Sequence, residues 1–281
     1  MTAPNQARRT ALSAVLLAIA LWLGACAGAG GGASGGFTPR HPGTLTVATA
    51  EVPDPGLWAG TFARPTGGFE YGLARALAER FGLGRVHVVE IPFAKLIAGD
   101  LGGADLALSD ITVTSERAKH LDFSSSYLSA PPAIVVKPGT EVPDVHAAQR
   151  LRWAVQTGTT LQSALNEAIE PDQAPVVLDH QREVLSALRV GEVDAVMLDL
   201  PVALAYARES PHAYAVAAQL KSEDVLAAAL PKGSANLEAV DSALRAMSAD
   251  GTIESLGRRW LHTDLQGSRA EEVPVLRTEE E

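Results

Sequence analysis

From Leu45 onward, short apolar runs alternate with helical stripes, and this order limits the possible folds more than any other feature. Leu45–Ala50 (LTVATA) is rich in β-branched residues, as expected of a strand covered on both faces. Gly68–Leu83 has apolar residues at 69, 73, 74, 77, 78 and 81, the spacing of one helical face. Arg85–Phe93 has the pattern of the next strand, residues 95–104 include a short helix, and 105–109 and 132–138 are two further expected strands. The β-α-β-α-β order predicts an α/β fold with a mostly parallel sheet, right-handed crossovers and helices on its faces.

A second alternating set begins at Leu151. Its expected strands are 151–158, 174–179, 194–199 and 225–233, and its expected helices are 159–169, 180–193 and one that starts near Pro201. Two closing helices follow, divided at Gly251. Two α/β units of about ninety residues in series are therefore expected, which is a typical domain size.

The first 25 residues have the pattern of a signal peptide. Arg8 and Arg9 precede the apolar stretch Ala11–Leu23, which is shorter than the roughly twenty residues of a membrane span. The LGAC sequence that follows ends at Cys26, the only cysteine in the chain. This arrangement resembles the lipobox of bacterial lipoproteins and predicts a lipidated Cys26 that anchors the protein to the outer face of the cell membrane. The alternative is an ordinary signal peptide with Cys26 near the cleavage site.

Composition limits the remaining classes. Residues 26–43 are Gly-rich and predict a flexible tether, and the polar, acidic residues 266–281 predict a disordered tail. The hydrophobic fraction of 47% and charged fraction of 20% are those of a folded protein. A net charge of −10 without a basic patch argues against nucleic-acid binding. The seven histidines are scattered, so neither a metal site nor a cofactor is expected.

Residues 105–123 (DLALSDITVTSERAKHLDF) place polar side chains just after a predicted strand. One interpretation is a strand, a turn and a surface helix, with Arg117 in a solvated ion pair worth under about 1 kcal/mol. The other is that Thr112, Thr114 and Arg117 form one wall of an anion-binding cleft. Open α/β sheets bind ligands beyond the carboxyl ends of their strands, which favours the second interpretation.

Four phrases in order, DLALSDITVTSERAKHLDFSSSYL, WAVQTGTT, VGEVDAVMLDLP and LPKGS with ADGTIESLGRRWL, resemble the extracellular solute-binding proteins of family 3. The resemblance spans about Leu45 to His262 and implies a two-lobed periplasmic binding protein type 2 fold with a two-strand hinge. Lobe 1 would be 44–132 plus 227–265 and lobe 2 would be 133–226. It further implies that the protein captures an amino acid or similar small polar solute and delivers it to the permease of an ABC importer.

The resemblance also implies where the ligand binds. Arg117 would hold a ligand carboxylate bidentately, which lysine cannot do. Thr112 and the backbone of Thr112 and Ile111 would add hydrogen bonds, and Thr159 and Thr160 would reach the same carboxylate from the other lobe. The remaining implied contacts are Asp199 with the ligand ammonium, Phe93 as an apolar wall, Glu51 beside the ligand and Trp58 on an overhanging loop. The alternatives are a helix N-cap for Asp199 and plain packing for Phe93 and Trp58.

Three residues depart from the family pattern. Asp110 stands where a glycine is common, so it would bind the ammonium, favour a cationic ligand or cap a neighbouring helix. Gln156 replaces a position that is sometimes basic, and Leu198 is apolar where some relatives carry a polar residue. Together they favour a ligand with a cationic or neutral side chain.

Two other functions remain open from the sequence. An enzyme on the same fold, similar to cyclohexadienyl dehydratase, would need a general acid, and Asp110 or Glu51 are the candidates. A ligand-sensing module would use the same lobe closure as a transport protein, so sequence does not separate the two.

Overall fold

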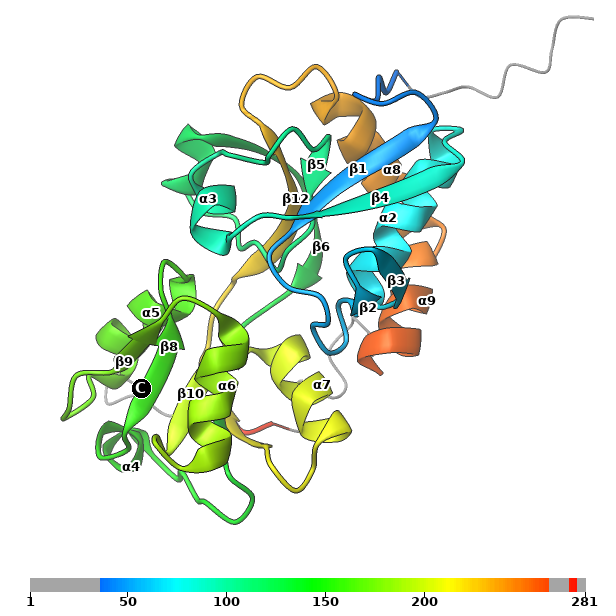
Figure 1. The fold of residues 1–281 in the computed structure, drawn as a ribbon. Helices are drawn as coiled ribbons and strands as arrows, with labels where there is room; N and C mark the ends of the chain where they lie inside the picture. The colour runs from blue at the N-terminus through cyan, green and yellow to red at the C-terminus, as the bar shows by residue number, and fades with distance from the viewer. Residues whose placement is uncertain (1–35, 263–272, 277–281) are drawn as a thin grey trace, which may run out of the picture. The chain divides into compact units, whose positions relative to one another are not determined.

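The computed structural model describes residues 36–262 and 273–276 (Figure 1). The first five-stranded sheet has the order β4-β1-β5-β12-β6. Its strands are β1 (Thr44–Thr49), β4 (Arg85–Glu90), β5 (Leu106–Ala107), β6 (Leu121–Ser129) and β12 (Val225–Pro231). A separate hairpin, β2 (Ala59–Thr61) with β3 (Arg64–Gly67), follows β1 in the chain.

The second five-stranded sheet has the order β11-β7-β10-β8-β9. Its strands are β7 (Pro132–Val136), β8 (Trp153–Gln156), β9 (Val176–Leu178), β10 (Ala195–Asp199) and β11 (Ala215–Gln219). The chain passes from the first sheet to the second between β6 and β7, and it returns between β11 and β12 (Figure 1). The two lengths of chain are joined there, because the amide of Ala130 donates to the carbonyl of Asp224 and that of Leu220 to the carbonyl of Pro132.

Each sheet is mixed, whereas the sequence pattern predicted mostly parallel sheets. In the first sheet β1 pairs in parallel with β4 and β5, but β12 pairs antiparallel with β5 and β6. In the second, β8 is parallel to β9 and β10, but β7 is antiparallel to β10 and β11. In each sheet, the strand that runs against the others is the one by which the chain enters the sheet at a crossing, β12 in the first and β7 in the second. The α/β class and the two-sheet organisation are as expected.

Helices cover the faces of both sheets. They are α2 (Phe69–Arg80), α3 (Phe93–Ile97), η1 (Arg117–Lys119), α4 (Val145–Gln149), α5 (Thr160–Ala164), η2 (Leu165–Ile169), α6 (Gln181–Val190), α7 (Leu200–Glu209), α8 (Leu237–Ala249), α9 (Thr252–Leu256) and η3 (Gly257–Leu261). The apolar stripe predicted for the first helix is buried at all six positions. Because successive strand side chains point to opposite faces, Leu45 and Val47 of β1 join the core beneath α2, while Ala48 joins a separate core with Phe93 and Leu96 of α3.

Strand β6 had no sequence signal, because its residues LDFSSSYLS are too polar to be recognised as a buried strand. It is nevertheless paired along its length with β12. Ser124 explains how a hydroxyl is accommodated there: it donates to the carbonyl of Ser125 at 2.9 Å and accepts the amide of Ala228 at 3.0 Å. A buried hydroxyl with partners in both roles carries little of the usual desolvation cost.

The ends of the folded part extend further than predicted. Phe37 falls inside the range expected to be a flexible tether, yet it is buried and stacks on Phe81 with ring centroids 4.2 Å apart. Val273 and Leu276 fall inside the expected disordered tail, yet both are buried. Gln219 holds this segment through backbone hydrogen bonds with Pro274 and Leu276. Both predictions were therefore wrong for these residues, because isolated apolar side chains in polar or Gly-rich segments give no periodic signal.

The predicted signal peptide, Cys26 and most of the tether lie outside the described residues. Across 36–262 and 273–276, none of the helices has the length and apolar character needed to cross a bilayer.

Candidate functional site

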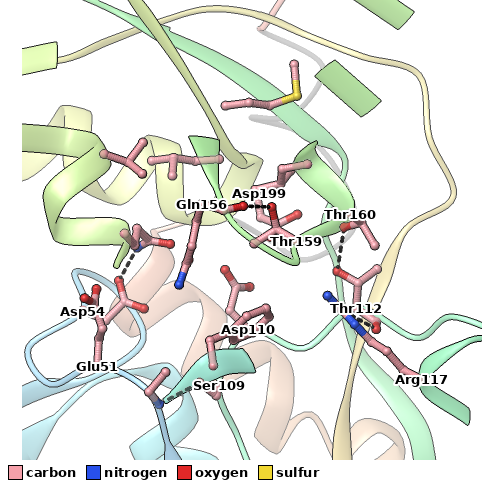
Figure 2. Close-up of a pocket in the computed structure, with 17 residues that line it drawn as sticks. Glu51, Asp54, Ser109, Asp110, Thr112, Arg117, Gln156, Thr159, Thr160 and Asp199 are labelled. Carbon is pink, nitrogen blue, oxygen red and sulfur yellow. Dashed lines mark hydrogen bonds between the residues drawn. The ribbon is translucent and has the colours of Figure 1, made fainter. Parts of the chain in front are cut away.

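A pocket lies where polar residues follow the carboxyl ends of strands in both sheets (Figure 2). The space between atoms there is about 580 Å³, with the open mouth of the pocket included. Eight of the ten residues predicted for ligand binding line it: Glu51, Phe93, Asp110, Thr112, Arg117, Thr159, Thr160 and Asp199. These residues come from segments far apart in the chain, so the pocket is formed only when both sheets have folded.

Arg117 is buried at one side of this pocket and does not point into bulk water. Its Nη1 donates to the carbonyl of Thr112 at 2.7 Å and its Nη2 to the carbonyl of Gly158 at 3.1 Å. The guanidinium lies over the ring of Phe93, 5.4 Å from its centroid. Burial lowers the pKa of Arg117, and the nearby Asp199, Asp110 and Asp224 oppose that shift. The guanidinium has five N–H donors, so donors remain for an anion in the pocket.

Thr159 and Thr160 begin α5 at the opposite side of the pocket. Thr159 is the N-cap: its hydroxyl accepts the amide of Gln162 at 3.2 Å and donates to the carbonyl of Gln156 at 2.8 Å. The Thr160 hydroxyl instead lies 3.3 Å from that of Thr112. Thr159 therefore shapes the helix start, whereas the pair of Thr112 and Thr160 offers hydroxyl groups to an anion held by Arg117.

Asp110 and Asp199 both line the pocket next to Arg117, and each affects the pKa of the other. Burial raises the pKa of Asp110 to about 7, and the charge of Glu70 adds to the shift. Burial also raises the pKa of Asp199 well above its usual range, followed by the charge of Asp110. Asp199 precedes α7 with Pro201 in the first turn, but its side chain makes no capping hydrogen bond, which argues against the N-cap interpretation. Both carboxyl groups are thus available to a cation.

Trp58 was predicted to overhang the cleft, and this is wrong. It is 1% exposed, does not line the pocket, and donates from Nε1 to Oε2 of Glu70 at 2.7 Å. Oε1 of Glu70 accepts the Tyr127 hydroxyl at 2.5 Å and the Asp110 amide at 2.9 Å. Glu70 is therefore a buried support beneath Asp110. The sequence signal for this role is a glutamate in the first turn of an otherwise apolar helix face.

Ile111 also does not line the pocket. Its side chain is completely buried in the core that contains Phe93, and its carbonyl accepts the amide of Ala227 at 3.3 Å. Ile111 holds the loop between Asp110 and Thr112 against the first sheet, because an apolar side chain between two polar pocket residues anchors the backbone from behind.

The far end of the pocket contains residues that no sequence pattern predicted. Asp54 accepts a hydrogen bond from Nε2 of Gln181 at 3.0 Å, and Glu51 pairs with Nη1 of Arg182 at 3.1 Å. Burial raises the pKa of Asp54 well above its usual range, and Asp110, Glu51 and Glu70 add to the shift. Gln181 and Arg182 begin α6 in the second unit, so no local pattern could have paired them with 51–54.

Ser109, Val184, Met197, Gln156 and Leu198 complete much of the lining. The two departures at 156 and 198 thus lie in the pocket. Gln156 donates to the carbonyl of Asp179 at 3.1 Å. In the described part of the chain, no group of three or more His, Cys, Asp or Glu side chains has the arrangement of a metal site.

Comparison with known proteins finds solved structures with a similar fold and identifies a family. The L-cystine-binding protein TcyJ of Escherichia coli strain K12 is 27% identical over 227 residues, covering 79% of this chain and 84% of TcyJ. An ancestral arginine-binding protein solved with glutamine is 30% identical with a TM-score of 0.70, over 79% of this chain and 99% of that one. A Streptococcus pneumoniae amino acid ABC transporter substrate-binding protein solved with L-arginine is 29% identical with a TM-score of 0.68, over 80% and 94%. The family model for bacterial extracellular solute-binding proteins, family 3, matches residues 62–263, and the chain belongs to this family.

Proposed function

We propose that the pocket binds an α-amino acid through three neighbouring subsites. Arg117, Thr112 and Thr160 take the α-carboxylate, and Asp110 with Asp199 takes the α-ammonium. The observation that carries this proposal is the adjacent placement of one buried guanidinium and two buried carboxyl groups in a pocket lined by both sheets. Figure 2 places Arg117 and Asp110 along the pocket in that order, with Glu51 and Asp54 at its far side. An α-amino acid carries its carboxylate, its ammonium and its side chain on one carbon, so the three groups can reach these three neighbouring subsites together.

The third subsite would receive the ligand side chain. Glu51, Asp54, Gln156 and Gln181 provide acidic and amide groups there, and the cation Arg182 is already paired with Glu51. An acidic side chain would meet like charges, whereas a cationic or amide side chain would find acceptors. This supports a ligand with a cationic or neutral polar side chain. Relatives that bind arginine, glutamine and cystine agree with that class.

Delivery of the bound amino acid to an ABC importer follows from the same relatives, several of which are named as components of amino acid ABC transporters. The family is extracellular, and the N-terminal pattern supports anchoring through a lipidated Cys26. Hydrogen bonds already join the two units across the pocket, from Arg117 to Gly158 and from Gln181 to Asp54. A ligand between them would add contacts that exist only when the units are together, which is how binding stabilises a closed form.

An enzymatic role on the same fold has less support. Asp110 and Glu51, the candidates for a general acid, are both in the pocket, but the matched relatives are binding proteins. Buried carboxyl groups with raised pKa values are expected at a cation-binding site as well as at a catalytic one.

Isothermal titration against a panel of L-amino acids tests the proposal. Arg117→Ala should weaken the tightest ligand by at least roughly a hundredfold, because each hydrogen bond to a charged group contributes about 1.5–3 kcal/mol and a carboxylate fork makes two. Arg117→Lys keeps the charge but not the fork, and should also bind weakly. Arg245→Ala is the matched control, since Arg245 forms an exposed pair with Asp241 on α8. Unchanged affinity in Arg117→Ala, with folding verified by thermal melting, would contradict the carboxylate assignment.

A further inference from the structure

Asp110 and Asp199 carry more negative charge than their surroundings neutralise. Oδ1 of each is buried and accepts no hydrogen bond from the described residues, and both side chains line the same pocket, where each carboxyl group affects the pKa of the other. Two ionised carboxylates are acceptors only, so a hydrogen bond between them requires a proton on one. One proton held between the two side chains would give both of these buried carboxyl groups a hydrogen-bond partner.

The backbone conformation of Asp110 also supports the pairing of its carboxyl group with that of Asp199. Its φ of 53° lies in the left-handed region, which a glycine adopts without the cost of about 1–2 kcal/mol that a side chain adds. The strained conformation is held by the amide hydrogen bond to Glu70 and by Ile111, buried on the other side. It directs the Asp110 carboxyl into the pocket beside Asp199, as Figure 2 shows.

The charges around Asp110 and Asp199 disfavour a negative charge on both side chains at once. The groups that face it from all neighbouring elements are Glu70 with its Tyr127 partner from α2 and β6, Asp224 from the β11–β12 crossing, Arg117 from η1, and, further along the pocket, Asp54, Glu51 and Arg182. Arg117 is the one cation among these that acts directly on both carboxyl groups. Glu70 and Asp224 oppose it, and burial disfavours a second negative charge.

We propose that Asp110 and Asp199 share one proton in the empty protein, and that the cationic nitrogen of the ligand replaces this proton when it binds. The step rests on the proposed function. The ammonium enters with its charge, both carboxyl groups become carboxylates, and the displaced proton passes to bulk water. The site thus selects ligands that carry a full positive charge at this position and couples their capture to proton release.

The direction of the pH dependence follows from the folded-state pKa of about 7 for Asp110, raised from an ordinary value of 3.8. An acid with a raised pKa binds a proton in the folded state that the unfolded state has lost, so its stabilisation is complete below about pH 4 and disappears as pH rises through 7. Ligand binding has the opposite preference, because it needs the pair deprotonated. Affinity should rise with pH by up to about tenfold per unit below 7 and level off above it.

The first experiment needs no ligand. Chemical unfolding of the wild type and of Asp110→Asn is measured between pH 5 and 8. In the wild type, loss of the shared proton should raise the unfolding constant about tenfold for each pH unit between 5 and 7. The asparagine amide can donate to Asp199 without a shared proton, so this rise should be absent from the variant. Asp250→Asn is the matched control, because the pKa of Asp250 is held at about 2, mainly by its Thr252 hydrogen bond, and does not titrate in this range. Equal slopes in the wild type and Asp110→Asn overturn the proposal, whatever the ligand is.

The second experiment uses L-arginine as the probe, titrated calorimetrically at pH 6 in phosphate and in a buffer of high ionisation enthalpy. Wild-type protein should release close to one proton per ligand, and Asp110→Asn close to none. Nα-acetyl-L-arginine, which lacks the ammonium, should not bind. Binding without proton release overturns the proposal. Absence of any binding of L-arginine counts against the side-chain class in the proposed function, while the unfolding slopes still decide on the shared proton.

Discussion

Glu70 offers the sharpest test of how the pocket is supported from below. It is completely buried and accepts three hydrogen bonds, from Trp58 and Tyr127 and from the amide of Asp110. Glutamine has the same shape but only one acceptor oxygen. With that oxygen in the place of Oε1, the amide nitrogen of Glu70→Gln faces the Trp58 N–H, donor against donor. An unsatisfied buried donor costs about 1–3 kcal/mol.

Part of this cost is offset, because burial already raises the pKa of Glu70 and a neutral amide is less costly to bury than a carboxylate. We therefore expect Glu70→Gln to lower the free energy of unfolding by about 2 kcal/mol. For a domain of this size that lowers the melting temperature by about 4–8 °C. Loss of the Glu70 charge should also lower the pKa of Asp110, since that charge is the second largest cause of its rise.

A double-mutant cycle isolates the contact between Glu70 and Trp58. Trp58→Phe alone leaves Oε2 of Glu70 without its donor, but in combination with Glu70→Gln it removes the donor clash. The double variant should be less destabilised than the sum of the single variants by at least about 0.5 kcal/mol. Trp153→Phe is the matched control: its indole donates to the carbonyl of Ala148 in the other sheet's core, so its effect should add to that of Glu70→Gln. The free energies of unfolding are measured by circular dichroism in urea. If the effects of Trp58→Phe and Glu70→Gln are additive, the reasoning is refuted.

Two further outcomes are expected. Phe37→Ala should cost about 3–5 kcal/mol of stability in urea unfolding, because it removes a buried ring stacked on Phe81; a loss under about 1 kcal/mol, the range of an exposed side chain, would mean that the segment is not packed in solution. Cys26→Ala should move the protein from the membrane to the soluble fraction of its native host, as read by immunoblot of the two fractions, and continued membrane retention would contradict lipid anchoring.

Much of the fold was accessible from local patterns. The period of apolar residues identified α2 and the strands β1, β4, β8 and β10 to within a few residues, because each of these elements buries one regular face or both faces. Strand β6 was not recognisable, since its hydroxyl groups find partners far away in the chain: Ser124 with Ala228, Ser125 with Asp241 and Tyr127 with Glu70. The hairpin β2–β3 and strand β11 were missed as well, because neither presents a clear period.

The candidate site divides in the same way. Arg117, Thr112, Thr160 and Asp199 lie in short motifs at strand ends, where sequence and topology together predict a ligand. The residues that were missed or misjudged depend on long-range contacts: Gln181 meets Asp54 across 127 residues of chain, and the indole of Trp58 is turned inward to Glu70. Whether a loop tryptophan faces solvent or a buried carboxylate depends on what packs above it, and no local pattern contains that information.

The sequence by itself therefore determined the α/β class, the order of the elements and the polar motifs at the strand ends, because these follow from short-range periodicity and residue chemistry. Only the tertiary structure decided that the sheets are mixed, that Phe37 and Leu276 belong to the folded part, and that Asp110 and Asp199 line the same pocket. Burial and the approach of like charges depend on segments distant in the chain, and these two effects raise the pKa values of the pair.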